Sequence, residues 1–363
     1  ALSSAASDVY KRQEKYGSDP LRWYMITNSS PWDNLKFDVD GIEEVRRKFF
    51  GTLYNTYSFF SLYANVDGFE YKEADVPMVE RPEIDRWILS VLNTLVKEVD
   101  TCYSEYEPTK AGRLISDFVN DNLSNWYVRL NRKRFWGGEF TQDKLSAYQT
   151  LYTCLETVAK LMSPIAPFYA DKLYMDLVTA TGRDNVVSVH LAKFPEYKEE
   201  MIDKELEARM QMAQDVTSMV LALRRKADIK VRQPLYTAWI PITNEDMERR
   251  LNAVKHLIEA EVNVKSLTLM SSNTIGMIIK RVKCDYKKMG PKFGKLMKSI
   301  AIAVEELSQE EILKFESERK YSLKINDTVA VIELSDVEIL TEDAPGMLTI
   351  CLLYTSDAAD DKA

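Results

Sequence analysis

The sequence predicts a mainly α protein, in which a helical bundle is followed by a small α+β domain. Apolar residues recur at helical spacing in the first part, as in Ile88, Leu92, Leu95 and Val99, at intervals of 4, 3 and 4. Further along, runs such as LYTAWIPI (235–242) and VKSLTLM (264–270) are typical of strands. The chain has 363 residues, of which 45% are hydrophobic and 29% charged. That composition is ordinary for a globular protein, and the length suggests two or three domains.

Three successive helices predict the bundle. The first is expected over residues 85–105. Pro108 suits the first turn of the second helix, whose stripe Ile115, Phe118, Asn122, Trp126 and Leu130 occupies one face. The third helix carries a stripe from Leu151 to Met162 and is ended by SPIAPF. Sequential helices with short connections indicate antiparallel packing.

The α+β domain is expected after a linker over residues 186–200. A long helix over 203–226 comes first, and a helix over 245–258 separates the two strands already named. The run KYSLKINDTVAVIELSDVEIL predicts a hairpin that turns at Asn326 and Asp327. The ends of the chain, 1–13 and 351–363, resemble translated sequencing-adaptor read-through, so we expect them to be artefactual or disordered.

Catalytic and metal-binding signatures are missing from the sequence. It has no GxGxxG, Walker or GxSxG motif, and its two histidines, His190 and His256, lie far apart. Its four cysteines are scattered without a CxxC pair, which favours a reducing cytoplasm and gives no zinc-ligand spacing. No apolar run of 18 residues predicts a membrane span. We therefore predict no catalytic residue and no metal ligand in this chain.

The net charge is −8 and the pI about 5.2, so any binding of nucleic acid has to depend on local clusters of positive charge. The first cluster, residues 110–136, contains NWYVRLNRKRFW. On a helix Arg129, Arg132 and Trp136 fall on the side away from the Ile115–Leu130 stripe, whereas Trp126 falls within it. The interpretation as a solvated helix face competes with RNA binding, in which bases stack on aromatic rings while cations hold the backbone. The candidate RNA-binding residues here are Trp126, Arg129, Arg132, Lys133, Arg134 and Trp136.

Two more clusters follow. ALRRKADIKVRQPL (222–235) places five cations and one acid at a corner between a helix and a strand. Its candidate RNA-binding residues are Arg224, Arg225, Lys230, Arg232 and Gln233. The third cluster, residues 280–300, has lysines at mixed spacing, and a solvated face and RNA binding are equally open there.

These motifs resemble class I aminoacyl-tRNA synthetases. YGSDPLRWYMITNSSPWDNLKFD is similar to the segment that closes their catalytic domain, and SNWYVRLNRKRFW with LMSPIAPFYADKLY is similar to their helical anticodon-binding domain. With IKVRQPL and KKMGPKFGKLMK, residues 14–350 resemble the C-terminal part of isoleucyl-tRNA synthetases. The resemblance implies the end of the catalytic domain at 14–40, the anticodon-binding domain at 41–196 and the C-terminal domain at 197–350.

The function that this resemblance implies is isoleucine–tRNA ligation. The HIGH motif, the KMSKS loop and the editing insert of the family are absent from this sequence. Because these motifs are missing, we expect the chain to be inactive alone. By the resemblance we expect a cytoplasmic, monomeric protein that binds tRNA for isoleucine. The resemblance implies ATP and magnesium for the parent enzyme. Valyl- and leucyl-tRNA synthetases share the architecture, and a non-catalytic tRNA-binding scaffold is the alternative from another class.

Overall fold

The structure, a computed structural model, describes residues 15–30, 32–34, 36–183, 185–242, 244–271, 278–325 and 328–343. It divides into two compact units, residues 1–210 and 211–363, and each is described by itself. The two ends suspected of being artefactual, together with Asn326 and Asp327 of the expected hairpin turn, lie outside the described residues. The domain boundary expected between residues 196 and 197 stays a prediction.

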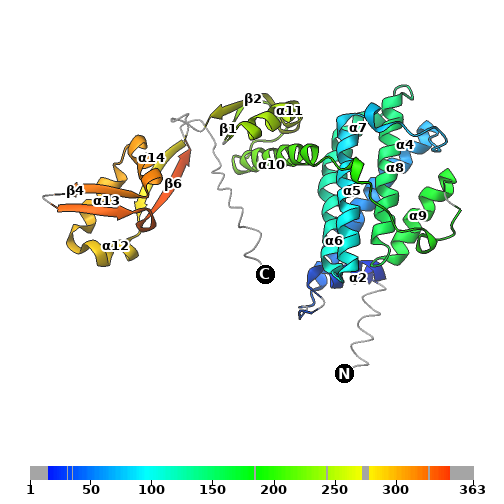
Figure 1. The fold of residues 1–363 in the computed structure, drawn as a ribbon, viewed down its shortest axis with the longest axis horizontal. Coiled ribbons are helices and arrows are strands. Elements are labelled where there is room, and N and C mark those ends of the chain that lie inside the picture. Colours follow the sequence, from blue (N-terminus) through cyan, green and yellow to red (C-terminus); the bar gives the residue numbers. More distant parts are fainter. Residues whose placement is uncertain are drawn as a thin grey trace. The chain divides into compact units, whose positions relative to one another are not determined.

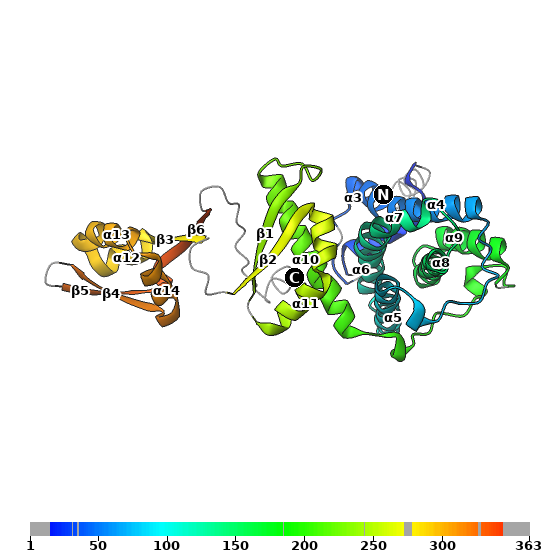
Figure 2. The same cartoon turned by 90° about the horizontal axis from the view of Figure 1, so that it is seen from above.

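The first unit is helical, as the sequence predicted. Figures 1 and 2 both show α5, α6 and α8 side by side, and the contacts among these helices agree. Its longer elements are α2 (Ser18–Asn28), α3 (Val39–Val45), η1 (Arg46–Phe50), α4 (Gly51–Asp67), α5 (Glu83–Ser104), α6 (Pro108–Asp117), η3 (Phe118–Val128), α7 (Arg129–Phe135), α8 (Gln142–Met162) and α9 (Pro167–Thr181). Short 3-10 turns are η2 (Met78–Glu80), η4 (Val189–Leu191) and η5 (Glu199–Met201), and α10 (Lys204–Lys226) runs across the division into units.

The expected apolar stripes form the core of the bundle. Ile88, Leu92, Leu95 and Val99 of α5 are all buried, and so are the residues of the Leu151–Met162 stripe on α8. Pro108 lies in the first turn of α6, where its missing N–H leaves no helix hydrogen bond unmade. Thr141 caps α8 by accepting a hydrogen bond from the Lys144 N–H.

The second predicted helix differs from the expectation in its backbone. Residues 118–128 form an eleven-residue π-helix, η3, between α6 and α7. In a π-helix each N–H bonds five residues back, so each turn is wider than in an α-helix. Residues spaced by four can therefore share one face over several turns, and Phe118, Trp126 and the neighbouring Tyr127 and Val128 are all buried. The segment packs against α4, α5 and α6.

Gly112 allows α2 and α6 to approach closely. A Cβ at this position would lie 2.5 Å from Cγ2 of Thr27 and 3.4 Å from Cδ1 of Ile165. Thr27 is held in place because its hydroxyl donates to the Trp23 carbonyl oxygen at 2.7 Å. The Trp23 indole N–H donates to the Ser116 hydroxyl at 3.1 Å, which joins the same two helices.

Replacing Gly112 with Ala is expected to lower the free energy of unfolding by about 1 kcal/mol. Overpacking costs roughly 1–3 kcal/mol, which exceeds the gain of about 1 kcal/mol in helix propensity. The control is Gly51→Ala, because Gly51 also lies in a helix but its added Cβ would be 3.4 Å from the Arg46 carbonyl oxygen, an ordinary van der Waals distance. Chemical denaturation should show opposite shifts for the two variants, and a stabilised Gly112→Ala variant would contradict the close packing.

The second unit contains a β–α–β element. Strands β1 (Leu235–Ile242) and β2 (Val264–Ser271) pair in parallel, and α11 (Glu245–Val262) connects them. The helix buries Leu251, Val254, Ile258 and Val262, and Glu259 accepts a hydrogen bond from the Leu267 N–H at 2.7 Å. Both strands, the intervening helix and the preceding long helix were predicted from the sequence.

Residues 278–343 hold a separate apolar cluster. Strand β3 (Ile278–Cys284) pairs antiparallel with β6 (Val337–Asp343), and β4 (Lys320–Ile325) with β5 (Thr328–Glu333), which confirms the expected hairpin pairing. The helices are α12 (Tyr286–Phe293), α13 (Met297–Glu305) and α14 (Gln309–Glu318), with turns η6 (Gly294–Leu296) and η7 (Leu334–Asp336). Their cluster centres on Met289, Ile300, Val304, Phe315 and Ile332. The sequence reading missed β3 and these helices, because lysines interrupt their apolar periodicity.

Candidate nucleic-acid interface

Helix α7 presents cationic side chains to solvent. Arg129, Arg132 and Lys133 are exposed, and their spacing of three and four residues makes them neighbours on one helix face. The side chains of Arg132 and Lys133 form no hydrogen bond or ion pair with a described residue. Trp136 ends the helix with 54% of its surface exposed. We call Arg129, Arg132, Lys133 and Trp136 the cationic ridge.

The chain turns sharply after the ridge. Gly137 and Gly138 have φ angles of 95° and 82°, a region that residues with a side chain rarely adopt. No atom lies within 4 Å of a Cβ built on either glycine. The backbone therefore leaves α7 directly after Trp136, and the indole stays exposed, as the sequence predicted.

Arg134 is turned into the bundle and does not belong to the ridge. Its Nη1 and Nη2 donate to the two carboxylate oxygens of Asp85 at 2.6 and 2.9 Å, and its Nε donates to Asp143 at 2.9 Å. Only 15% of the Arg134 side chain is exposed, and none of the Asp85 side chain. This geometry corrects the expectation that Arg134 is placed for RNA, because a bidentate pair with a buried carboxylate occupies the guanidinium.

Asp85 is the centre of a buried polar network that the sequence reading missed. Besides Arg134, it accepts hydrogen bonds from the Tyr127 hydroxyl at 2.8 Å and the Ser146 hydroxyl at 2.6 Å. Burial, followed by the neighbouring Asp85 carboxylate, raises the pKa of Tyr127. Burial acts to lower the pKa of the Arg134 guanidinium, but the hydrogen bonds to Asp85 and Asp143 and the charges of Tyr127 and Asp85 together outweigh it and raise that pKa. The network joins α5, η3, α7 and α8 beneath the ridge.

Trp126 is a core residue, with 4% of its surface exposed. Its indole N–H has no hydrogen-bond partner among the described residues. The side chain therefore offers no face on which a base could stack. Its inclusion among the candidate RNA-binding residues is corrected, whereas its place in the apolar stripe is confirmed.

The corner loop, residues 227–234, connects α10 to β1 and is exposed on its outer side. Arg225, just before the loop, and Lys230, Arg232 and Gln233 within it are exposed, as an RNA contact requires. Lys230 pairs with Asp228 at 3.1 Å. Arg224 is instead 2% exposed, so it cannot reach RNA and its assignment as an RNA-binding residue is corrected.

The third basic cluster is partly neutralised. Lys292 pairs with Asp336 at 2.6 Å and Lys288 with Asp285 at 3.5 Å. Lys283 and Lys298 are exposed. These ion pairs within the same domain neutralise part of the positive charge of the cluster, which favours a solvated face over an RNA surface.

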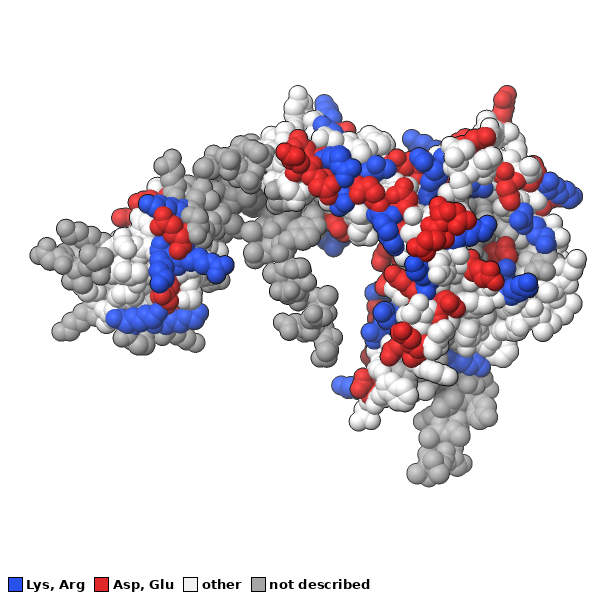
Figure 3. Space-filling model, viewed as in Figure 1, with Lys and Arg blue, Asp and Glu red and all other residues white. Residues whose placement is uncertain are grey.

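Charge on the first unit is mixed. On the face of that unit drawn in Figure 3, lysine and arginine are interspersed with aspartate and glutamate. Fields from exposed charges are screened within about 8 Å at physiological ionic strength. Binding of a polyanion therefore depends on local groups such as the ridge.

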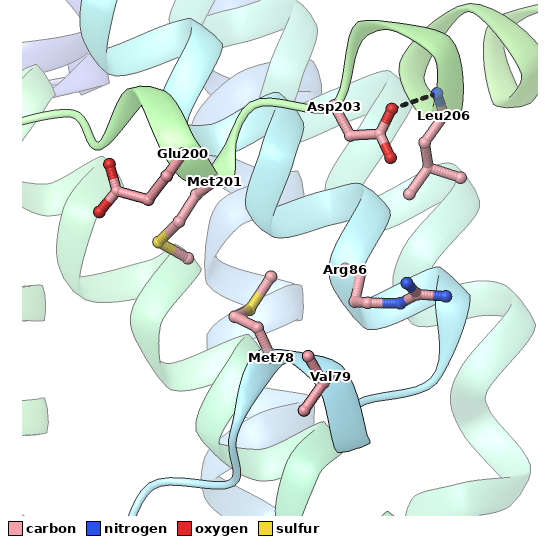
Figure 4. Close-up of a pocket in the computed structure, with 7 residues that line it drawn as sticks. All are labelled: Met78, Val79, Arg86, Glu200, Met201, Asp203 and Leu206. Atoms are coloured by element: carbon pink, nitrogen blue, oxygen red, sulfur yellow. Dashed lines mark hydrogen bonds between the residues drawn. The ribbon is translucent and has the colours of Figure 1, made fainter.

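Two cavities lie among the described residues of the first unit. A cavity of about 200 Å³ is lined by Met78, Val79, Arg86, Glu200, Met201, Asp203 and Leu206. Figure 4 shows that Asp203 in this pocket accepts the Leu206 N–H, at 3.0 Å, and so caps α10. A neighbouring cavity of about 390 Å³ contains Tyr71, and burial raises the pKa of that phenol to about 12, away from the range useful for proton transfer near neutrality.

Neither a metal-binding cluster nor a membrane-spanning helix occurs among the described residues. Among the described residues no group of three or more His, Cys, Asp or Glu side chains could hold a metal ion. Cys102, Cys154 and Cys284 are buried free thiols, and Cys351 lies outside the part of the chain that the structure describes. No described helix is both long and apolar enough to cross a bilayer.

Comparison with known proteins shows which proteins this chain is similar to. Residues 85–238 match the anticodon-binding domain of tRNA ligase, a range that contains the ridge, the Asp85 network and the corner loop. Isoleucine–tRNA ligase of Bacteroides thetaiotaomicron is 76% identical over 343 residues, which cover 94% of this chain and 29% of that protein. The enzymes of Porphyromonas gingivalis and Cytophaga hutchinsonii are 60% and 55% identical, over 94% and 92% of this chain and 30% of each of theirs.

The chain thus spans about three tenths of the length of the curated relatives that it matches. The identity is high over nearly all of this chain, and the matched domain agrees with the names of these relatives. The chain is therefore similar to a segment of isoleucine–tRNA ligases, and its residues 85–238 match an anticodon-binding domain of tRNA ligase.

Proposed function

We propose that this segment holds the anticodon region of isoleucine-acceptor tRNA, with the cationic ridge and the corner loop as its RNA contacts. The observation that carries the proposal is the ridge itself: cations on one face of α7 lead to an exposed tryptophan within the matched domain. Anticodon bases are single-stranded, so their faces can stack on an indole while Arg and Lys hold the backbone.

For the whole protein we propose ligation of isoleucine to its tRNA with ATP and magnesium. The names of the relatives support isoleucine over valine or leucine. We further propose that the protein acts as a monomer in the cytoplasm. The segment described here contributes tRNA binding, and we expect no activation of isoleucine by it alone.

The proposal is tested by the salt dependence of tRNA binding. Replacing Arg132 with Ala is expected to flatten the plot of log binding constant against log salt by about 0.7, because one fewer counterion is released from single-stranded RNA. Filter binding with a tRNA transcript that carries an isoleucine anticodon measures the slope. Thermal melting should show little change, since Arg132 is exposed.

The matched control is Lys172→Ala, which removes the same charge from the exposed face of α9, where Lys172 pairs with Asp176. Its slope should equal that of the parent. A transcript with a substituted anticodon should bind more weakly to the parent. Equal slopes for the parent and the Arg132→Ala variant would show that the ridge is only a solvated helix face.

A further inference from the structure

The corner loop is folded around a buried guanidinium. Arg224 lies in the last turn of α10, and its Nη2 donates to the carbonyl oxygens of Lys230, at 3.3 Å, Val231, at 3.1 Å, and Gln233. The loop backbone is tied further by the Ile229 N–H, which donates to the Arg224 carbonyl oxygen at 2.8 Å. Arg224 therefore holds the loop from within.

This guanidinium lacks the usual compensation for a buried charge. Its Nε and Nη1 are buried without a hydrogen-bond partner, and no carboxylate pairs with it, among the residues that the structure describes. An arginine stays charged even when buried, and a buried charge without a counter-ion is costly. An apolar residue could fill the same volume without this cost, so packing alone gives no reason for an arginine here.

The outer surface of the loop explains why an arginine occupies this buried position. Lys230 and Arg232 are exposed there, as are Arg225 and Lys226 at the adjoining end of α10, and Asp228 is the one acid between residues 224 and 235. Carbonyl oxygens repel phosphate oxygens, and Arg224 draws three of them inward. The result is a loop with exposed cations on its outer side, while three of its backbone carbonyl oxygens accept hydrogen bonds on the inner side.

We propose that Arg224 is a positioning residue, which holds the cationic side chains of the corner loop in one arrangement that receives an RNA backbone phosphate. The inference rests on the proposed function. It adds that Arg224 determines the shape of the corner loop, the second RNA contact surface. Arg224 does not touch the RNA. Arg232, which is exposed and forms no ion pair with a described residue, makes the contact that Arg224 positions.

The first test measures the order of the loop without RNA. Hydrogen exchange of the full chain should be faster at the amides of Ile229, Gln233 and Leu235 in Arg224→Gln than in the parent. Arg224→Lys, which keeps the charge and can donate to several carbonyls, should restore most of the protection. Arg209→Gln is the control on the same helix, because Arg209 pairs with Glu83, away from the loop. Unchanged exchange in Arg224→Gln would overturn the inference.

The second test is a double-mutant cycle with the same tRNA transcript. Arg232→Ala should flatten the salt slope by about 0.7–0.9 in the parent background and by close to zero in Arg224→Gln. A merely destabilising role of Arg224 would leave the effect of Arg232→Ala intact in the folded protein, and that result would overturn the inference.

The two proposals fail in different ways. If Arg132→Ala flattens the slope and Arg232→Ala does not, the ridge binds RNA and the inference about the corner loop is wrong. If neither substitution changes the slope, the proposed function is wrong at both surfaces, and the inference is wrong with it.

Discussion

Replacing Asp85 with Ala is expected to lower the free energy of unfolding by about 3–5 kcal/mol, because it leaves a largely buried arginine without its main counter-ion. The Asp85 carboxylate accepts four hydrogen bonds, two from Arg134 and one each from Tyr127 and Ser146. The Tyr127 and Ser146 hydroxyls would lose this acceptor. Arg134 would keep only its hydrogen bonds to Asn131 and Asp143. Urea denaturation of the full chain, followed by circular dichroism, measures the change.

The control for Asp85 is the other carboxylate that binds the same guanidinium. Asp143 also accepts hydrogen bonds from Arg134, but half of its side chain is exposed to solvent. Exposed ion pairs contribute about 0–1 kcal/mol, so Asp143→Ala should change the stability by no more than that. Equal losses for the two variants would mean that the burial of Asp85 does not determine the strength of the pair.

Trp126 in the core and Trp136 in the ridge should respond in opposite ways to replacement by Ala. Trp126→Ala is expected to cost about 3–5 kcal/mol of stability, as for a buried aromatic residue. Trp136→Ala should cost roughly 1–3 kcal/mol of tRNA binding if a base stacks on the indole, and should leave the melting temperature almost unchanged. Their exposed fractions, 4% and 54%, are the reason for the contrast.

Thermal melting and tRNA filter binding on both variants measure these effects. Trp136→Phe is a useful second variant, because it keeps a ring on which a base can stack and should retain part of the affinity. If Trp136→Ala binds tRNA as tightly as the parent, no base stacks on the Trp136 indole and that part of the proposal is wrong. A parent-like melt of Trp126→Ala would contradict its place in the core.

The helices and strands that the sequence predicted are those with a strong apolar period. Helices α5, α8 and α10 and the β1–α11–β2 element each carry a regular stripe or strand run, so local patterning was sufficient. The exposure of Arg132 and Trp136 followed from the same reasoning. Helices α12 and α13 were not predicted from the sequence, because lysines interrupt their short apolar stripes.

The roles of Arg134 and Arg224 could not be read from local patterning. Both look like members of basic clusters, but Arg134 meets Asp85, 49 positions earlier in the chain, and Arg224 meets backbone carbonyls of a folded loop. One local signal was available for the first pair. Asp85 lies three residues before Ile88, on the apolar face of its helix, where an acid needs a buried partner.

The π-helical segment Phe118–Val128 has a consequence for how related chains are aligned. Each residue of an α-helix turns the chain by about 100°, so one residue inserted or deleted before Arg129 would rotate the whole of α7 by that angle if the wider turns did not absorb it. The direction in which Arg132 and Trp136 emerge thus depends on the hydrogen-bond ladder of a neighbouring segment that contains no cation. Relatives that differ in length within this segment can present the same surface only if their helical winding changes to compensate.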